Sequence, residues 1–499
     1  MSYSFIGLGE SDGSDVLRFA DLTAFPAVTS LGAAFAFTAE REQLLKRQRI
    51  VRAASETDGF GEFLREIGER AREYGFMRRE RSTKRENQFI TLLDARFYTS
   101  FVDYVCLEAE KFGATDSVFD DYFKLCREER ASEQFRSLSE NLERLNATAS
   151  NVKSVTLGVN LSSSLKPLEA GLVRINDRPY RSGDFLDRLF RLDFNDDGFV
   201  CMAPLTRYGG DKNYGGRTAL NNALNEALGE VMNSALKSSK ASVDNYFYSR
   251  LEVLLPNAAD LAFLSAACAY IDDLRSHGAY FCYPEIAECS SRVSGIYDPS
   301  MLYTKAFADI VKNDAVFAPA DAVGDIAGDT KRLYILTGPN SGGKTVFLRA
   351  LGTVWLIFQS GLPVPAKSAS LVPCDNINTA FPASLTRTDV KNREGRLEEE
   401  CRYLADMLPT LGERSLVLCD EVYSSTSASD AEKLANNWLH RVASMGSMCV
   451  FATHLHELTS SAPDCCGRLA AGASRTYKII SGSSADSGAL LIAQKYGLI

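Results

Sequence analysis

Apolar residues recur at helical spacing over much of the first 300 residues. From about residue 34 to 147, and again from about 217 to 278, they return every three or four positions, as Phe60, Leu64 and Ile67 do. This spacing predicts amphipathic helices, each with one face that must pack against a partner. The amino-terminal part of the chain is therefore expected to be mostly helical.

The pattern changes from about residue 152 to 216. Val155, Leu157, Val159 and Leu161 alternate with other residues, which predicts a strand, and residues 171–175 predict a second one. The stretch 206–216 is rich in Gly, Asn and Asp and contains Arg, Lys and Tyr, so it is interpreted as an exposed loop. We expect a small strand-containing insertion within the helical part.

Beyond about residue 313 short apolar runs alternate with helical patterns. The runs are 333–337, 416–419 and 449–452, and the helices are expected at 344–358, 396–411 and 429–444. Strands that alternate with helices predict a doubly wound α/β sheet. The expected fold is thus multidomain, α and α/β, with a helical core or lever domain over 1–312 and an α/β domain over 313–499.

Composition and charge narrow the classes of function. The 499 residues include 45% hydrophobic and 24% charged residues, which excludes a disordered chain, and the net charge of −9 excludes a broadly basic nucleic-acid coat. Residues 1–330 hold 38 Lys and Arg against 49 Asp and Glu. The twelve cysteines form no Cys-x-x-Cys pair, and no apolar run begins the chain, so a soluble, cytoplasmic protein with reduced thiols is expected.

A phosphate-binding motif follows the first apolar run of the α/β part. The sequence between Gly338 and Thr345 fits G-x-x-x-x-G-K-[ST] and lies between a strand and a helix, as a P-loop requires. Lys344 is expected to reach the β- and γ-phosphates of ATP and Thr345 to ligate Mg²⁺. The expected nucleotide-binding residues are Gly338, Pro339, Asn340, Ser341, Gly342, Gly343, Lys344 and Thr345, joined by Asp420.

Two further strand ends carry candidate catalytic residues. The run 416–419 ends in Asp420 and Glu421, of which Asp420 is expected to hold Mg²⁺ and Glu421 to polarise the attacking water. The run 449–452 is followed by His454, which is placed to contact the γ-phosphate, because strand ends line the nucleotide crevice in such sheets. Glu421, His454 and Lys344 are therefore the catalytic candidates.

These motifs together resemble the ATPase domain of the MutS family. The resemblance rests on the string 337–345, on Asp420 and Glu421 with the following serines and threonine, on 451–454, and on 364–367. It covers about residues 331–460. It implies a P-loop NTPase domain of the ABC-like type, and an ATPase that acts as a homodimer around mismatched or structured DNA.

The resemblance also assigns roles to single residues. Asn340 would sense the γ-phosphate, and the segment Ser425, Thr426 and Ser427 would face the partner subunit. MutS proteins carry a Ser-Thr-Phe stretch whose serine reaches across the dimer, and Gly395, Arg396 and Leu397 stand there in this sequence. Arg396 either replaces that serine with its guanidinium or is a solvated helix residue that pairs with Glu400.

The function expected from these observations is that of an ATP-switched dimeric clamp in DNA repair or recombination. The sequence predicts a short form, without the mismatch-recognition and connector domains of long MutS proteins. An alternative is an ATP-driven protein clamp or scaffold that does not bind DNA, which the acidic charge of residues 1–330 favours. A transporter ATPase is disfavoured, because no Leu-Ser-Gly-Gly-Gln signature occurs.

Other candidate sites are weaker. Residues 193–204 begin like a calcium loop but have Pro204 at the twelfth position, and the His and Cys residues of 454–466 match no zinc spacing. Phe60 and Glu62 form a Phe-x-Glu string, which lies on an apolar helix face and is interpreted as core. The basic run 78–85 is either a phosphate-contacting surface or a solvated helix end.

Overall fold

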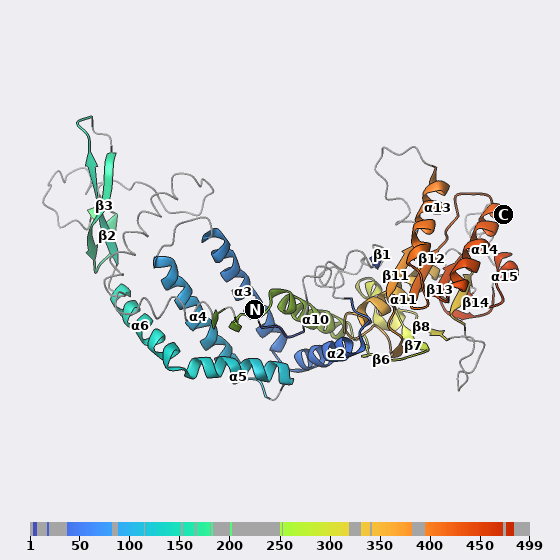
Figure 1. The fold of residues 1–499 in the computed structure, drawn as a ribbon, viewed down its shortest axis with the longest axis horizontal. Helices are drawn as coiled ribbons and strands as arrows, with labels where there is room; N and C mark the ends of the chain where they lie inside the picture. The colour runs from blue at the N-terminus through green and yellow to red at the C-terminus, as the bar shows by residue number, and fades with distance from the viewer. Residues whose placement is uncertain are drawn as a thin grey trace. The chain divides into compact units, whose positions relative to one another are not determined.

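The computed structural model divides by its internal contacts into two compact units (Figure 1). Unit 1 comprises residues 1–3 and 66–257, and unit 2 comprises 4–65 and 258–499. The expected domain boundary between 312 and 313 falls inside unit 2 and stays a prediction. The structure describes residues 3–6, 17–18, 37–81, 88–113, 115–150, 153–164, 167–179, 181–182, 200–201, 250–251, 253–318, 331–339, 342–381, 395–472 and 476–483.

Unit 1 is built mainly from helices, as the spacing of apolar residues predicted. They are the later part of α3 (Phe60–Arg81), α4 (Gln88–Ala109), α5 (Ser117–Ala131) and α6 (Glu133–Ser150). Helix α4 packs against both α5 and α6. Asp116 caps α5 by accepting a hydrogen bond from the amide of Val118 (3.0 Å), which satisfies a backbone donor that a helix start leaves free.

A two-stranded hairpin follows these helices. Strand β2 (Ser154–Leu161) pairs antiparallel with β3 (Pro167–Asn176), and Gly158 lies opposite Gly171. The two expected strands are thus confirmed. A further short pair, β4 (Arg181–Ser182) and β5 (Val200–Cys201), is parallel. The expected loop 206–216, residues 193–199 of the calcium-like stretch and the expected helices over 217–249 lie outside the described residues.

The centre of unit 2 is a seven-stranded mixed sheet (Figure 1). In spatial order its strands are β1 (Leu17–Arg18), β11 (Asn376–Ala380), β12 (Ser415–Asp420), β13 (Met448–Ala452), β9 (Leu333–Thr337), β14 (Cys466–Ala471) and β15 (Ile479–Ser481). All neighbours are parallel except β14 and β15. Mixed helical and α/β structure is therefore confirmed, whereas β1 was not expected, since two residues carry no periodicity.

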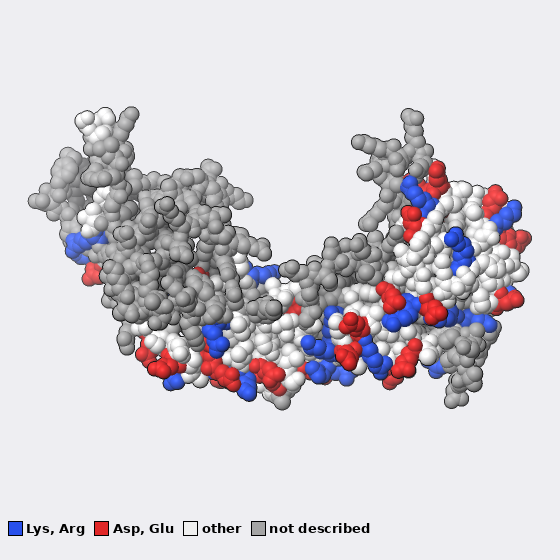
Figure 2. All heavy atoms as spheres, in the orientation of Figure 1, with Lys and Arg blue, Asp and Glu red and all other residues white. Residues whose placement is uncertain are grey.

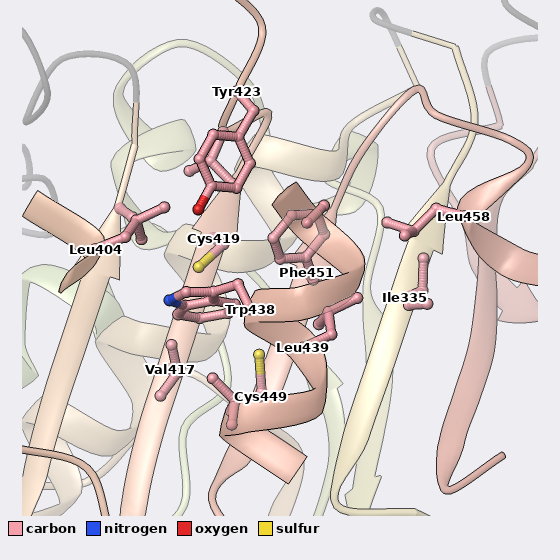
Figure 3. Close-up of a cluster of buried hydrophobic side chains, with 14 of the residues drawn as sticks. Ile335, Leu404, Val417, Cys419, Tyr423, Trp438, Leu439, Cys449, Phe451 and Leu458 are labelled. Carbon is pink, nitrogen blue, oxygen red and sulfur yellow. The ribbon is translucent and has the colours of Figure 1, made fainter. Parts of the chain in front are cut away.

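Helices cover both faces of this sheet. Helices α13 (Arg396–Met407), α14 (Ala428–Ser444) and α15 (Leu458–Ser461) join the strands in one apolar cluster, in which Trp438 packs 6.0 Å from Phe451 between ring centroids (Figure 3). Helix α11 (Lys344–Phe358) contacts β12 and β13 and contributes no residue to that cluster, so it covers the opposite face. Helix α13 is shorter than expected. It passes at Leu408 into the 3-10 turn η6 (Leu408–Thr410), where Pro409 lacks an amide donor.

A second, four-stranded mixed sheet and two packed helices complete unit 2. The strands, in spatial order, are β6 (Glu285–Ile286), β10 (Ser368–Leu371), β7 (Ser291–Ile296) and β8 (Asn313–Phe317). Helix α2 (Arg41–Glu56) packs against α10 (Ala258–Ser276), and the 3-10 turns η4 (Pro299–Tyr303) and η5 (Phe307–Asp309) link β7 to β8. Phe60 is fully buried, which confirms its interpretation as a core residue.

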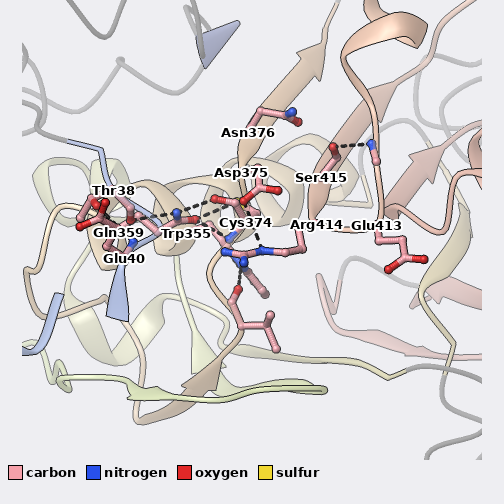
Figure 4. Close-up of polar contacts among 12 residues, drawn as sticks. Thr38, Glu40, Trp355, Gln359, Cys374, Asp375, Asn376, Glu413, Arg414 and Ser415 are labelled. Atoms are coloured by element: carbon pink, nitrogen blue, oxygen red, sulfur yellow. Dashed lines mark hydrogen bonds and ion pairs between the residues drawn. The ribbon is translucent and has the colours of Figure 1, made fainter. Parts of the chain in front are cut away.

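The far end of α11 is fastened by the side chain of Gln359 (Figure 4). Its amide nitrogen donates to the carbonyls of Thr38 (3.1 Å) and Cys374 (2.7 Å), and its oxygen accepts from the Cys374 amide (3.0 Å). Gln359 is fully buried, so these bonds satisfy polar groups that burial would otherwise penalise. These bonds hold the end of α11 in place.

No helix in the described part of the chain is long and apolar enough to cross a membrane.

Candidate nucleotide-binding site

Three parallel strands bring the predicted site residues to one edge of the large sheet. Strands β12, β13 and β9 are direct neighbours and run in the same direction, so their carboxyl ends meet. Backbone bonds extend this contact beyond the strands: the Glu421 amide donates to the Ala452 carbonyl and the Thr453 amide to the Leu336 carbonyl, both at 2.9 Å. The ends that carry Asp420, His454 and the P-loop are therefore adjacent.

The loop between β9 and α11 requires glycine at its two ends. Gly338 and Gly343 have φ angles of 134° and 90°, in the left-handed region that side chains rarely adopt. A Cβ at Gly342 would lie 2.9 Å from the Pro339 carbonyl oxygen. The backbone can thus turn tightly into the first turn of α11, while Asn340 and Ser341 lie outside the described residues.

Lys344 points its ammonium group back into this loop. Its side chain is buried, and Nζ donates to the carbonyls of Gly338 (2.8 Å) and Pro339 (3.2 Å) and lies 3.4 Å from Oε1 of Glu421. A buried lysine needs such partners, because an unpaired charge is costly away from water. The contacts place a positive charge at the mouth of the loop, beside the predicted catalytic glutamate.

Thr345 and Asp420 join the first turn of α11 to the end of β12. The Thr345 hydroxyl donates to Oδ2 of Asp420 at 2.6 Å. Asp420 is buried, and its other oxygen, Oδ1, has no hydrogen-bond partner among the described residues. Burial raises the pKa of Asp420, the Thr345 hydrogen bond lowers it, Glu421 raises it, and Lys344 and Arg349 lower it.

Oδ1 of Asp420 and the hydroxyl oxygen of Thr345 together fit a magnesium ion. Mg²⁺ is bound in nucleotide sites by carboxylates and hydroxyls together with phosphate oxygens and water. Asp420 offers a buried carboxylate oxygen that lacks a partner in the described protein, and Thr345 offers a hydroxyl beside it. The two residues predicted to hold Mg²⁺ therefore lie in contact, and their binding of the ion stays a prediction.

Glu421 and His454 lie at the same edge in different surroundings. Glu421 has a φ of 51°, unusual for a non-glycine residue, and its side chain is 26% exposed. Tyr423, two residues later, has a φ of 63° and a buried ring that packs in the cluster of Figure 3. The turn after β12 is thus held by a buried aromatic ring, whereas His454 is exposed directly after β13.

The four residues predicted to contact a partner subunit lie at or near the starts of helices α13 and α14. Arg396 begins α13 and its Nε lies 3.2 Å from Oε1 of the buried Glu400, so the ion pair named as one alternative is present. Ser427 caps α14 by accepting a bond from the Asp430 amide (3.2 Å). Ser425 is exposed and Thr426 half-buried. Their contact with a partner stays a prediction.

A pocket beside the P-loop contains residues that no motif indicated. Its volume is about 320 Å³, and its walls are the first turns of α11, Tyr477, and the segment between β7 and β8 that includes Tyr297, Met301 and Lys305. The Lys305 ammonium lies 5.7 Å from the centre of the Tyr477 ring. Tyr477 and this segment are more than 150 residues apart, so no local pattern could have joined them.

Comparison with known proteins agrees with this geometry. Residues 334–468 match the family described as MutS domain V, a range that begins in β9 and ends in β14. This part of the chain is therefore similar to the MutS family, both to its domain model and to single members. The predicted resemblance is thereby confirmed, and the matched range holds the P-loop, Asp420, Glu421 and His454 within one MutS domain.

Two curated MutS proteins show the same similarity at the level of residues. The chain is 31% identical over 212 residues to the DNA mismatch repair protein MutS of Chlorobium limicola, which covers 42% of this chain and 22% of that protein. It is 30% identical over 224 residues to the DNA mismatch repair protein MutS of Thermosynechococcus vestitus, covering 44% and 24%. The chain thus spans less than a quarter of the length of these MutS relatives.

Proposed function

We propose that unit 2 binds ATP with Mg²⁺ at the P-loop edge of its large sheet and hydrolyses it to ADP and phosphate. The observation that carries the proposal is the 2.6 Å hydrogen bond between Thr345 and Asp420, which joins the P-loop helix to the acidic strand. The 3.4 Å approach of Lys344 to Glu421 adds the other two reactive groups at the same place. The MutS domain V match over 334–468 supports it.

The phosphates would be bound by the chain's own backbone and by Lys344. The loop 338–343 and the start of α11 present amide groups and the positive end of the helix dipole to an anion. Lys344 would exchange its contacts with the Gly338 and Pro339 carbonyls for phosphate oxygens. Thr345 and Asp420 would hold Mg²⁺, which supplies charge neutralisation to the phosphate oxygens.

Glu421 would act as the general base. In hydrolysis a water oxygen bonds to the γ-phosphorus while the bond from that phosphorus to the β–γ bridging oxygen breaks, and the water loses a proton. The half-buried carboxylate of Glu421 would accept this proton. Asn340 and His454 would complete the γ-phosphate surroundings.

The base of the nucleotide would enter the pocket beside α11. The pocket of about 320 Å³ adjoins Gly343 and Lys344, and Tyr477, a residue that is 38% exposed, lines its wall. An exposed aromatic ring can stack on a purine. This placement joins the phosphate and base subsites in one continuous site of unit 2.

The glutamine variant of Glu421 tests the proposal. Glu421→Gln removes the base and keeps the shape of the side chain, so we expect phosphate release to fall by about a hundredfold or more while binding of a fluorescent ATP analogue stays within about twofold. Glu413→Gln, an exposed glutamate of the same unit, is the control. Turnover by Glu421→Gln at the wild-type rate would contradict the assignment.

At the level of the whole protein we propose an ATP-switched homodimeric clamp that acts on mismatched or distorted DNA. Both curated relatives are named as DNA mismatch repair proteins, which supports this proposal. ATP would join two α/β domains (313–499), with Arg396 and the segment Ser425, Thr426 and Ser427 facing the partner, and change the angle of the helical lever (1–312).

A second candidate is a clamp whose client is protein. The excess of acidic residues over 1–330 favours it, and Figure 2 shows acidic and basic side chains intermingled over the described residues of unit 2, without a broad basic area on that face. Salt titration of binding to duplex, mismatched and four-way DNA separates the two. Phosphate contacts lose affinity steeply with salt, whereas a protein clamp binds none of these probes at low salt.

A further inference from the structure

Helix α11 carries a single arginine, one turn beyond the residues of the P-loop. Arg349 follows Thr345 by four positions, and residues four apart lie on the same side of an α-helix. That side is the one from which Thr345 reaches Asp420 at the end of β12. No sequence motif marked Arg349, yet it is the second cation, after Lys344, whose charge acts on this carboxylate.

Arg349 and Asp420 share an unusual feature. The Nε of Arg349 is buried without a hydrogen-bond partner among the described residues, and so is Oδ1 of Asp420. Buried polar atoms are nearly always paired, and each unpaired one costs stability. The charge of Arg349 also acts on Asp420, whose pKa it lowers against the larger effect of burial. Opposite charges at one helix–strand junction thus both have bonding capacity left over.

Lys344, the other cation that lowers the pKa of Asp420, has partners of its own. Its Nζ is held by the carbonyls of Gly338 and Pro339 and by proximity to Glu421. When phosphate binds, the Lys344 ammonium group would pair with the phosphate oxygens. Arg349 is then the cation that is left for Asp420 among the described residues.

We propose that Arg349 is a positioning residue for Asp420. Its guanidinium charge holds the carboxylate at the end of β12 so that Oδ1 stays directed into the site, and it thereby sets how tightly the site takes Mg²⁺ together with nucleotide. This inference rests on the proposed function, since it assigns Arg349 a part in the same metal site. It concerns orientation, not contact with the substrate.

The first test measures binding of a fluorescent ATP analogue to the full chain as Mg²⁺ is raised from zero. Arg349→Gln should raise the Mg²⁺ concentration at half-saturation about tenfold or more and leave binding of Mg²⁺-free nucleotide within about twofold. Arg349→Lys keeps the charge but holds it further from the carboxylate, so it should reduce the shift to about threefold. Arg414→Gln, which removes an arginine ion-paired with Asp375 at 3.2 Å elsewhere in unit 2 (Figure 4), should change neither quantity.

Two results of the first test would show that Arg349 does not position Asp420. A shift in the Mg²⁺ requirement of less than about twofold, or an equal loss of Mg²⁺-bound and Mg²⁺-free nucleotide, would overturn the proposal, because a merely structural role weakens both. If Arg349→Gln fails to fold, Arg349→Lys against Arg414→Lys decides. A charge held further from the carboxylate should then shift the Mg²⁺ requirement about threefold, and no shift overturns the proposal.

A second test needs no nucleotide. In a double-mutant cycle of Arg349→Gln and Asp420→Asn, thermal unfolding is followed by tryptophan fluorescence, since Trp355 and Trp438 both lie in unit 2. If Arg349 acts on Asp420, the change in Tm caused by Arg349→Gln should largely vanish in the Asp420→Asn background, and additive changes overturn the proposal. Should the wild type bind no nucleotide, the proposed function fails, while this cycle still decides whether the two residues interact.

Discussion

Each unit of the molecule buries a carboxylate, and the two carboxylates are treated in opposite ways. In unit 1, Glu129 of α5 is 1% exposed, its Oε1 accepts a bond from the Tyr98 hydroxyl, and its Oε2 lies 2.8 Å from Nε of Arg250. In unit 2, Asp420 is 3% exposed, and only Oδ2 has a partner among the described residues. Both oxygens of the Glu129 carboxylate thus have partners, whereas only one oxygen of the Asp420 carboxylate has a described partner.

The difference separates a structural role from a binding role. Glu129 joins α5 to Tyr98 of α4 and to Arg250, so its bonds are already made in the folded chain. Asp420 lies where three strand ends meet, beside a lysine and a threonine, and its Oδ1 has no partner among the described residues, which agrees with the binding role proposed for it. Asp420 therefore differs from Glu129 in two respects: one oxygen lacks a partner among the described residues, and the carboxylate lies at the edge where the predicted site residues meet.

The largest effect on stability is expected at Glu129. Glu129→Leu removes the bonds that the carboxylate accepts from the hydroxyl of the fully buried Tyr98 and from Arg250, and we expect a loss of about 1–3 kcal/mol in the free energy of unfolding. Both tryptophans, Trp355 and Trp438, lie in unit 2, so circular dichroism should report the change and tryptophan fluorescence should report less of it.

Its neighbour supplies the control for this variant. Glu128 has a side chain that is 65% exposed and 4.0 Å from Lys124, so Glu128→Leu should change the free energy of unfolding by less than about 0.5 kcal/mol. An equal effect of the two substitutions would remove the contrast between exposed and buried carboxylates. Equal shifts of both optical signals for Glu129→Leu would mean that the units unfold as one.

A smaller effect of opposite sign is expected at Asp420. Because burial raises the pKa of this carboxyl, the folded chain holds the proton more tightly than the unfolded chain, and stability falls as pH rises above the ordinary range of an aspartate. Asp420→Asn should therefore raise the Tm of the nucleotide-free protein at pH 7. The gain should close as the pH falls toward 4, and a loss of Tm at pH 7 would show that the carboxylate is structural.

Much of the site could be predicted from sequence because its residues follow short strands. The P-loop, Asp420, Glu421 and His454 each stand within a few residues of a buried apolar run, and parallel strands bring their ends together without further information. The helix starts at Lys344 and Arg396 were also expected where the structure has them. Local motifs and the α/β pattern were sufficient here.

The remainder depends on contacts between distant residues. Tyr477 and the segment 296–313 form the pocket beside α11 from parts of the chain that share no periodicity. Arg349 could have been found from its spacing to Thr345, but the significance of that spacing depends on two buried atoms that lack partners among the described residues, Nε of Arg349 and Oδ1 of Asp420. Strand β1, with two residues, offers no pattern at all.

The central claim is that Lys344 and its neighbours bind the phosphates of ATP. It is tested most directly by isothermal titration calorimetry of the full chain with ATP and Mg²⁺, comparing wild type, Lys344→Ala and the exposed control Lys433→Ala. We expect saturable binding by the wild type and Lys433→Ala, and a loss of about tenfold or more in affinity for Lys344→Ala. Equal affinity for all three proteins would contradict it.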